Sequence, residues 1–331
     1  MMMMIYGNVV DDVDDDILLT TLMMTMMMVC FFPPERTAAD PTTATPRHNF
    51  AFTPSSAGDT QTPWITAMVS TQHGRLVMAD YNNSKVKVCD LTDPYSLFAS
   101  RQLEVPPFGL ALLSDGLVAV TTGTKTIYLL GVGENRVSVK SRLETERVYV
   151  GVAGNSDDTL VVSCGEDGGR PSRVDVITRR GHVVRTVIDG RNLSGLEVPD
   201  YLCVADGQVW ISDFWAYTVH KVELTTGRAE CSQTHTYMKN PRQVAVDRLA
   251  GKASGSVYVA SYGGQCVMAR TGKGEWRRLL HGPRHSLRGY DIPCGVCSTD
   301  RGLVVAWCNE ALISDSVVIG YDIAADMGDT P

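Results

Sequence analysis

The side chains best suited to recognising another molecule are aromatic, amide and arginine residues that stand next to short apolar runs. Trp and Tyr combine a large ring with one hydrogen-bonding group, and Arg and Asn add directional donors. Residues of this kind are enriched where proteins bind other molecules. The candidate binding residues are Tyr81, Asn82, Asn83, Tyr201, Trp215, Tyr217, Arg242 and Tyr262.

Sequence signatures of hydrolases and phosphate-binding loops are missing: the chain has no G-x-S-x-G, no H-E-x-x-H and no Gly-rich phosphate loop. Oxygen-bearing residues at the ends of apolar runs would bind Ca²⁺ if they converged, but acidic residues also end strands as turn formers. A calcium-dependent lactonase or esterase is therefore the second alternative function, and we predict no catalytic residue, metal site or cofactor. The residues concerned are Asp80, Asp200, Asp213, Asp291 and Asn309.

One segment, Lys273–Arg288, is rich in basic residues and contains Trp276. Arginines beside an aromatic ring could hold phosphates and stack a base, so RNA binding is the first alternative function. The same residues also fit an outer strand followed by a solvated loop. The formal net charge of the whole chain is −7, and residues 1–63 hold eight acidic residues against two basic ones. The rest of the chain is nearly neutral, so it lacks the large basic field typical of nucleic-acid-binding proteins.

The nine cysteines are an odd number, and most stand within strand-like runs. This pattern favours free, buried thiols in a reducing compartment, and hence a cytoplasmic location, over a disulfide framework. Cys294 and Cys297 form the only C-x-x-C, and strand alternation would send their sulfurs to opposite faces. A zinc site would need a second pair of ligands, which the sequence lacks.

Residues 1–46 differ in composition from the rest of the chain. An acidic cluster, Asp11–Asp16, precedes the apolar run Ile17–Phe32, whereas a signal peptide carries basic residues there. The run is also shorter than the roughly 20 apolar residues of a membrane helix. Pro33–Pro63 is rich in Pro, Thr, Ser and Ala, as linkers are. We predict a disordered or low-complexity tail and no membrane partner, and a signal or anchor is the alternative left open.

Six short β-branched runs recur along the remaining chain, with anchor residues 41 to 49 positions apart. A repeat of this length built from short strands is typical of a propeller blade. We therefore predict an all-β fold, a six-bladed β-propeller over residues 47–331 with a disordered N-terminal tail. The anchors are Leu76, Leu117, Leu160, Val209, Val257 and Leu303, and the expected inner strands are 64–70, 108–114, 148–155, 201–206, 243–247 and 294–299.

The sixth repeat has no room for an outer strand, because the chain ends nine residues after the expected third strand, 316–322. An unpaired sheet edge promotes association. The alternating stretch His48–Thr53 stands just before the first inner strand, and we predict that it supplies the missing strand and closes the ring. The alternative is that it is plain linker.

The segment Gly74–Leu91 resembles an NHL repeat, in which a strand ending in Asp is followed by an Asn-bearing turn and an alternating strand. Later repeats keep this frame without the asparagines, and the resemblance covers 64–322. It implies a propeller similar to the C-terminal substrate-binding domain of tripartite-motif (TRIM-NHL) proteins, and hence a protein or peptide partner. Residues 1–63 hold one Cys and one His, too few for the zinc modules of a RING or B-box, so ligase activity is not predicted.

Propeller topology predicts where the candidate binding residues lie. If inner strands run from the upper face downward, the start of each inner strand and the turn after each second strand meet on that face. Loops at this face would carry function while the blades hold them in place. We predict non-catalytic recognition of a protein segment there, and the alternative for Phe108, Phe214 and Trp307 is packing between blades.

Overall fold

The computed structural model describes residues 46–322 except 72, 134, 157, 248–255, 271–273, 283–286, 288, 301 and 310–314. All of these belong to one compact unit, Thr37–Pro331. The predicted disordered tail lies outside the described residues. Within the described part of the chain, no helix is long and apolar enough to span a membrane.

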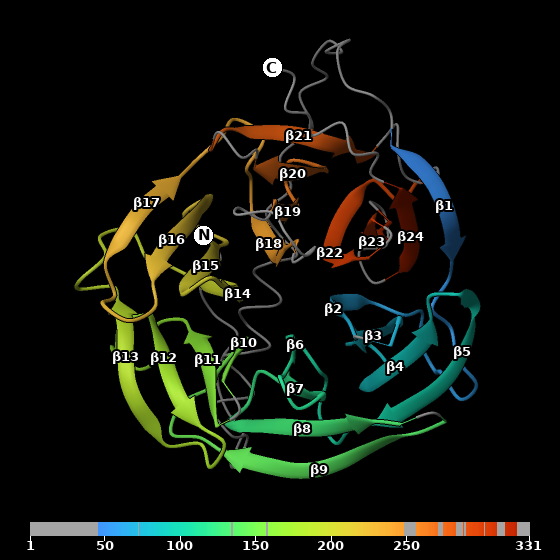
Figure 1. Ribbon diagram of the computed structural model, residues 1–331, viewed down its shortest axis with the longest axis horizontal. Coiled ribbons are helices and arrows are strands. Elements are labelled where there is room, and N and C mark those ends of the chain that lie inside the picture. The colour runs from blue at the N-terminus through green and yellow to red at the C-terminus, as the bar shows by residue number, and fades with distance from the viewer. Residues whose placement is uncertain are drawn as a thin grey trace, which may run out of the picture. The chain divides into compact units, whose positions relative to one another are not determined.

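The described residues form six four-stranded antiparallel sheets arranged as blades around a ring (Figure 1), which confirms the predicted all-β, six-bladed propeller. Blades 1 to 3 consist of β2 (Ile65–Ser70), β3 (Arg75–Asp80), β4 (Lys85–Asp90) and β5 (Asp93–Gln102); β6 (Leu110–Leu112), β7 (Leu117–Thr121), β8 (Thr126–Val132) and β9 (Val137–Glu144); and β10 (Gly151–Ser156), β11 (Thr159–Cys164), β12 (Arg173–Thr178) and β13 (Val183–Asp189). Blades 4 to 6 consist of β14 (Pro199–Ala205), β15 (Gln208–Asp213), β16 (Thr218–Glu223) and β17 (Ala229–Gln233); β18 (Pro241–Val246), β19 (Val257–Ser261), β20 (Cys266–Arg270) and β21 (Trp276–His281); and β22 (Ile292–Thr299), β23 (Gly302–Cys308), β24 (Ser316–Asp322) and β1 (Arg47–Phe52).

The first two strands of a blade are buried on both sides because each blade is covered by its two neighbours. In β18 all six residues are buried, and in β3 five of six are. Buried clusters join one blade to the next: Tyr258 and Leu280 of blade 5 pack with Val296 and Tyr321 of blade 6. Two-sided burial explains why these runs lack the polar alternation of a half-exposed strand.

Ring closure is made by the first strand of the chain. β1 pairs antiparallel with β24, from Arg47 opposite Asp322 to Phe52 opposite Val318, at the place expected for His48–Thr53. In Figure 1 the blue β1 lies beside the red β24 at the outer rim. Gly320 lies under the Phe50 ring, where an added Cβ would collide with that ring. The ring therefore closes with strands from both ends of the propeller.

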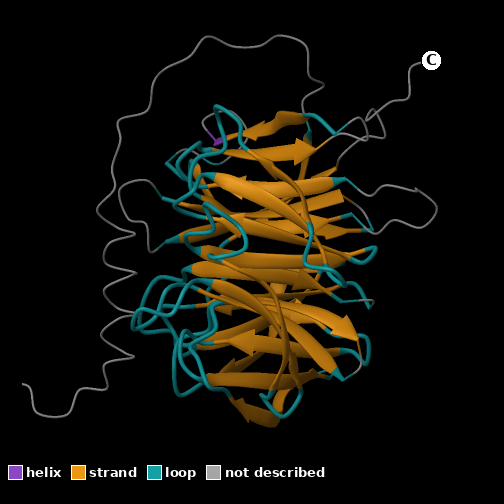
Figure 2. Ribbon diagram, turned by 90° about the vertical axis from the view of Figure 1, so that its left-hand side faces the viewer, coloured by secondary structure: helices purple, strands orange, loops and turns teal. Residues whose placement is uncertain are grey.

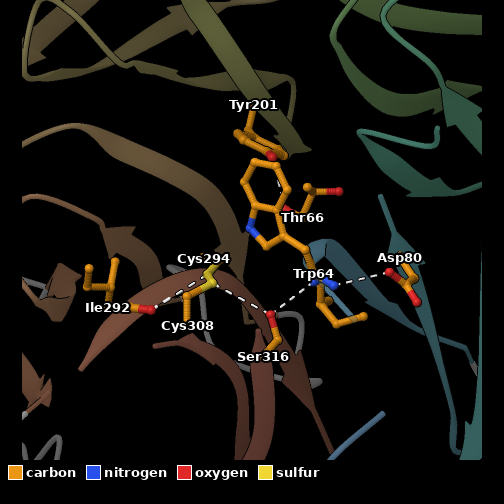
Figure 3. The surroundings of a disulfide bond; sticks show 9 residues. Trp64, Thr66, Asp80, Tyr201, Ile292, Cys294, Cys308 and Ser316 are labelled. Atoms are coloured by element: carbon orange, nitrogen blue, oxygen red, sulfur yellow. Dashed lines mark hydrogen bonds between the residues drawn. A yellow bond between two sulfur atoms is a disulfide. The ribbon is translucent and has the colours of Figure 1, made fainter. Parts of the chain in front are cut away.

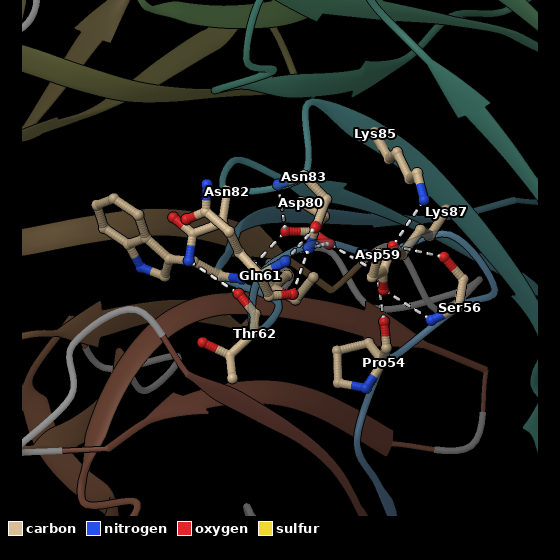
Figure 4. Close-up of polar contacts among 12 residues, drawn as sticks. Pro54, Ser56, Asp59, Gln61, Thr62, Asp80, Asn82, Asn83, Lys85 and Lys87 are labelled. Atoms are coloured by element: carbon tan, nitrogen blue, oxygen red, sulfur yellow. Dashed lines mark hydrogen bonds and ion pairs between the residues drawn. The ribbon is translucent and has the colours of Figure 1, made fainter.

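The segment that leads from β1 to β2 is fastened by a buried ion cluster (Figure 4). The Asp59 carboxylate lies 2.8 Å from Lys85 Nζ and 2.6 Å from Lys87 Nζ, and its side chain is 9% exposed. Lys87 Nζ also lies 2.6 Å from Asp80 Oδ2 and donates to the Pro54 carbonyl at 2.7 Å. Burial acts to raise the pKa of Asp59, but hydrogen bonds from Lys85, Lys87 and Ser56 outweigh it and hold the pKa at about 2.

The expectation that the cysteines are all free thiols is wrong for one pair. Cys294 of β22 and Cys308 of β23 form a disulfide with Cα atoms 6.4 Å apart (Figure 3). The register of β22 shifts between Pro293 and Gly295, so Cys294 is an extra residue that simple alternation does not place. Among the cysteines whose side chains are described, Cys89, Cys164, Cys203, Cys266 and Cys297 are not part of a disulfide.

Two N-terminal truncations test closure by β1. Removal of residues 1–45 leaves β1 intact, and we expect the melting temperature to stay within about a degree of that of the full chain. Removal of residues 1–55 deletes β1 and exposes β24 as an edge, so we expect a loss of several kcal/mol or self-association. Thermal denaturation with light scattering measures both effects, and equal melting temperatures for the two truncations would contradict this closure.

The ion cluster around Asp59 predicts a pH-dependent stability. Its pKa is lowered in the folded state, so its contribution is present above about pH 4 and is lost as the pH falls toward 2. We expect Asp59→Asn to cost roughly 3 kcal/mol at pH 7, because Lys87 is left buried with one anion fewer. The control is Asp158→Asn at an exposed turn. A deficit at Asp59→Asn that persists unchanged at pH 2 in denaturation experiments would refute this assignment.

Candidate functional site: the upper face

The upper face is the side of the ring where inner strands begin and second strands end. Its identity is fixed by backbone hydrogen bonds that repeat in three blades: Tyr81 N–H donates to the Trp64 carbonyl at 2.9 Å, Phe214 N–H to Val198 at 3.0 Å, and Tyr262 N–H to Asn240 at 3.2 Å. Each bond joins the turn after a second strand to the segment before an inner strand. Figure 2 shows the loops gathered on the two sides of the stacked blades. The predicted meeting of these loops is therefore observed.

Acidic residues at the ends of second strands clamp these turns. Asp80 Oδ1 accepts from Trp64 N–H at 3.1 Å, and its Oδ2 accepts from Asn83 Nδ2 at 2.9 Å. Asp213 accepts from Glu197 N–H at 2.7 Å and from Val198 N–H at 2.9 Å. Both side chains are fully buried. Their oxygens are engaged by the scaffold, which removes two of the five residues considered as calcium ligands.

Asn82 and Asn83 also hold the scaffold together (Figure 4). Asn83 is buried; its Oδ1 accepts from Thr60 and Gln61 N–H at 2.9 and 3.0 Å, and its Nδ2 donates to the Gln61 carbonyl at 2.9 Å. Asn82 Nδ2 donates to the Thr62 carbonyl at 2.8 Å and is half-buried. The Asn-bearing turn therefore fastens the segment 60–62. Asn83 was predicted to be a binding residue at the surface, but it is buried.

The centre of the upper face is occupied by the guanidinium of Arg242. Its Cζ lies 5.7 Å from the Trp64 ring, 5.8 Å from Phe214 and 5.1 Å from Tyr262. These rings come from blades 1, 4 and 5, so one cation stacks on three blades at once. Arg242 is 1% exposed, and it therefore joins the blades in place of the expected contact with a partner.

Tyr201 crosses the ring axis below this point. Its hydroxyl donates to the Thr66 carbonyl at 2.9 Å, which joins blade 4 to blade 1 on the opposite side, and its ring stacks on Phe108 at 5.3 Å. Gln243 of blade 5 similarly accepts from Met68 N–H at 3.0 Å and from Val296 N–H at 3.1 Å. Figure 3 shows Tyr201 beside Thr66, whose carbonyl accepts this hydrogen bond. Tyr201 is buried, so it too lies inside the propeller and not on the predicted binding surface.

Asp200 is the buried acid of this centre. Its side chain is 1% exposed, and its Oδ2 makes no hydrogen bond to any described residue. Burial raises the pKa of Asp200 to about 7, against the opposing effect of the Arg242 charge and with a further rise from Asp213. A carboxyl group that titrates near neutral pH therefore lies beside the central arginine.

Two groups of rings lead outward from Arg242 to the surface. Trp64 contacts Tyr81 edge-on at 5.2 Å, and Phe214 contacts Trp215 edge-on at 5.2 Å and Tyr262 at 6.4 Å. Tyr81, Trp215 and Tyr262 are half-buried, and Tyr217 is 36% exposed. With the half-buried Asn82, the structure thus leaves five of the predicted residues at least partly exposed, and it adds Trp64 and Phe214 beneath the aromatic ones. The only sequence signal for Trp64 was its place after Pro63, as the first residue of the expected inner strand 64–70.

The basic segment is largely engaged where it is described. Arg278 Cζ lies 4.3 Å from the Tyr237 ring, and the Trp276 indole donates to Gln233 Oε1. Arg284, His285 and Arg288 lie outside the described residues. Across the described part of the chain, no three His, Cys, Asp or Glu side chains are grouped as a metal ion requires.

These features define a six-bladed β-propeller with a side-chain-filled axis and an aromatic upper face. No protein-family model matches the sequence, and no curated protein matches it. Among solved structures, a nidogen/laminin complex matches with a TM-score of 0.55 and 13% identity over 71% of this chain and 84% of that chain. Streptogramin B lyase matches with a TM-score of 0.54 and 13% identity over 82% of this chain and 97% of that chain. Virginiamycin B lyase from Staphylococcus aureus matches with a TM-score of 0.55 and 10% identity over 80% of this chain and 96% of that chain. At these identities the likeness shows the propeller fold alone.

The position of Asp200 predicts how stability responds to pH. Its folded pKa is raised, so its favourable contribution is full below about pH 4 and is lost as the pH rises to 7 and above. An asparagine at this position does not ionise, so Asp200→Asn avoids this loss of stability. We therefore expect the melting temperature of the variant minus that of wild type to increase between pH 4 and pH 8. Asp158→Asn, at an exposed turn, is the control. A pH-independent difference for Asp200→Asn would contradict the assignment.

Proposed function

We propose that the protein is a non-catalytic binding propeller that recognises a protein segment through its upper face. The observation that carries the proposal is the set of half-exposed aromatic side chains around the buried Arg242. Large rings held by a rigid frame lose little conformational entropy when they bind, so they contribute strongly to affinity.

The turn between β15 and β16 is the richest part of this surface. Trp215 is half-buried and Tyr217 is 36% exposed, and neither side chain hydrogen-bonds to a residue that the structure describes. The indole N–H of Trp215 and the hydroxyl of Tyr217 are thus free to donate to a partner. Asp213, at the base of the turn, is fully buried, so the turn presents no exposed charge of its own.

The structural neighbours are compatible with more than one role for this fold. One was solved in a nidogen/laminin complex, whereas streptogramin B lyase is an enzyme. We favour binding because Tyr201, Gln243 and Arg242 are each engaged with residues of other blades, and because Asp80 and Asp213 accept hydrogen bonds from backbone donors. We also propose that the propeller belongs to the NHL class, that its role is similar to that of tripartite-motif proteins, and that the protein is cytoplasmic.

Selection of linear peptides by phage display on the full chain tests the proposed function. For a selected peptide, we expect Trp215→Ala to raise the Kd at least tenfold in fluorescence anisotropy, because the ring would fill part of the interface. Val184→Ala is the matched control, since Val184 is an exposed apolar residue of β13 at the outer rim. Neither Val184→Ala nor the pair Arg277→Ala and Arg278→Ala should change that Kd.

A 20-nucleotide oligouridylate distinguishes the nucleic-acid alternative. If the protein binds this RNA with a steep salt dependence, and loses it in the double arginine variant, RNA binding replaces the proposal. A calcium-dependent rise in melting temperature that Asp200→Ala abolishes would instead support the hydrolase alternative.

A further inference from the structure

Tyr217 has an unusual backbone. Its φ is +53°, in the left-handed region that residues with a Cβ adopt only at a cost. Glycine avoids this cost, and Asn or Asp reduce it, whereas a bulky ring on such a backbone is uncommon. Strain of this kind is found most often at functional sites, where the surrounding fold holds it in place.

The same backbone recurs at equivalent positions of two other blades. Ser84 and Gln265 have φ of +49° and +48°. Each of the three residues is the fourth after the end of a second strand, and each directly precedes the residue that pairs with that strand end: Lys85 with Asp80, Thr218 with Asp213, and Cys266 with Ser261. The turn frame thus imposes the left-handed residue, but only blade 4 places an aromatic ring there.

The ring of Tyr217 has no evident structural role that would offset this cost. It is one of the few large apolar side chains among the described residues that are exposed, at 36%. No ring contact or side-chain hydrogen bond ties it to the described part of the propeller, whereas Trp215 packs on Phe214. The residue is therefore placed for contact with something outside the chain.

We propose that Tyr217 is a specificity-determining residue of the upper face, retained at the expense of stability, and that with Trp215 it binds an uncharged, proline-containing extended segment of a partner protein. The inference rests on the proposed function and deepens it. Two rings two residues apart, each with one free donor, match a polyproline II helix, whose prolines pack on aromatic rings and whose backbone carbonyls lack internal partners.

The charge around the turn favours this partner over an acidic peptide or a nucleic acid. Residues 214–217 carry no charge, Asp213 is fully buried, and Arg242 is 1% exposed. The exposed charges on the segments bonded to this turn, Glu197 and Lys239, have opposite signs. A ligand that carries many phosphates would need exposed cations, since its affinity comes mainly from ion pairing. The affinity of an uncharged segment does not depend on such ion pairs.

Two displayed peptide libraries test the partner class, one with proline fixed at every third position and one without proline. We expect enrichment from the proline-fixed library on the wild-type chain. An enriched, fluorescein-labelled peptide then serves as the probe in anisotropy. We expect Tyr217→Gly and Tyr217→Ala to raise its Kd about 30-fold each, because both remove the ring.

Thermal denaturation of the same variants tests the backbone cost. Gly and Ala at position 217 both lack the ring and differ by one Cβ, so we expect Tyr217→Gly to melt about 2 °C above Tyr217→Ala. Ser84→Gly against Ser84→Ala, and Gln265→Gly against Gln265→Ala, should show the same order. All four of these controls should leave the Kd of the probe unchanged.

The possible failures are distinguishable. Enrichment only from the proline-free library would overturn the partner class, and a Kd within threefold of wild type for both Tyr217 variants would overturn the role of Tyr217. A melting temperature for Tyr217→Ala equal to or above that of Tyr217→Gly would overturn the stability cost. If neither library enriched any peptide, the proposed function itself would fail.

Discussion

Closure of the ring is the constraint on which the rest of this structure depends. The six blades are separate sheets, and the last one has only three strands until β1, from the start of the propeller, pairs with β24 as its fourth. The segment after β1 is then held by Asp59 between Lys85 and Lys87. This segment leads directly to Trp64, so the position of one ring of the central cluster follows from how the chain closes.

A second consequence of closure is that the axis can be filled. Only when opposite blades are held at a fixed distance can Tyr201 reach the Thr66 carbonyl, or Arg242 stack on rings from blades 1, 4 and 5. Burial of Arg242 and Asp200 costs solvation, and the cost is offset in part by stacking and by their opposite charges. The centre of the upper face is thus rigid and closed, which favours recognition by its rim over chemistry within the axis.

The upper-face turns show how one frame serves two purposes. In blade 1 the turn residues Asn82 and Asn83 bond to the neighbouring segment, and in blade 4 the same positions carry Trp215 and Ala216. Asp80 and Asp213 clamp both turns in the same way. Since the clamp holds the frame, the remaining turn positions are free to differ, and blade 4 uses them for exposed rings.

The blade architecture follows from patterns that are visible in the sequence alone. Short β-branched runs at regular spacing, and an alternating stretch ahead of the first of them, are local patterns, so the blades and the closing strand could be predicted from them. The choice of upper-face loops could be predicted too, because strand direction fixes which loops meet.

Which candidate residues are exposed depends instead on contacts between distant parts of the chain. Tyr201 and Arg242 looked like surface residues, but both lie inside, because their partners are 135 positions away in one case and on three blades in the other. The disulfide of Cys294 depends on a strand bulge that alternation does not reveal. Burial at the axis is set by how opposite blades pack, and that packing joins residues far apart in the chain, which no local pattern can report.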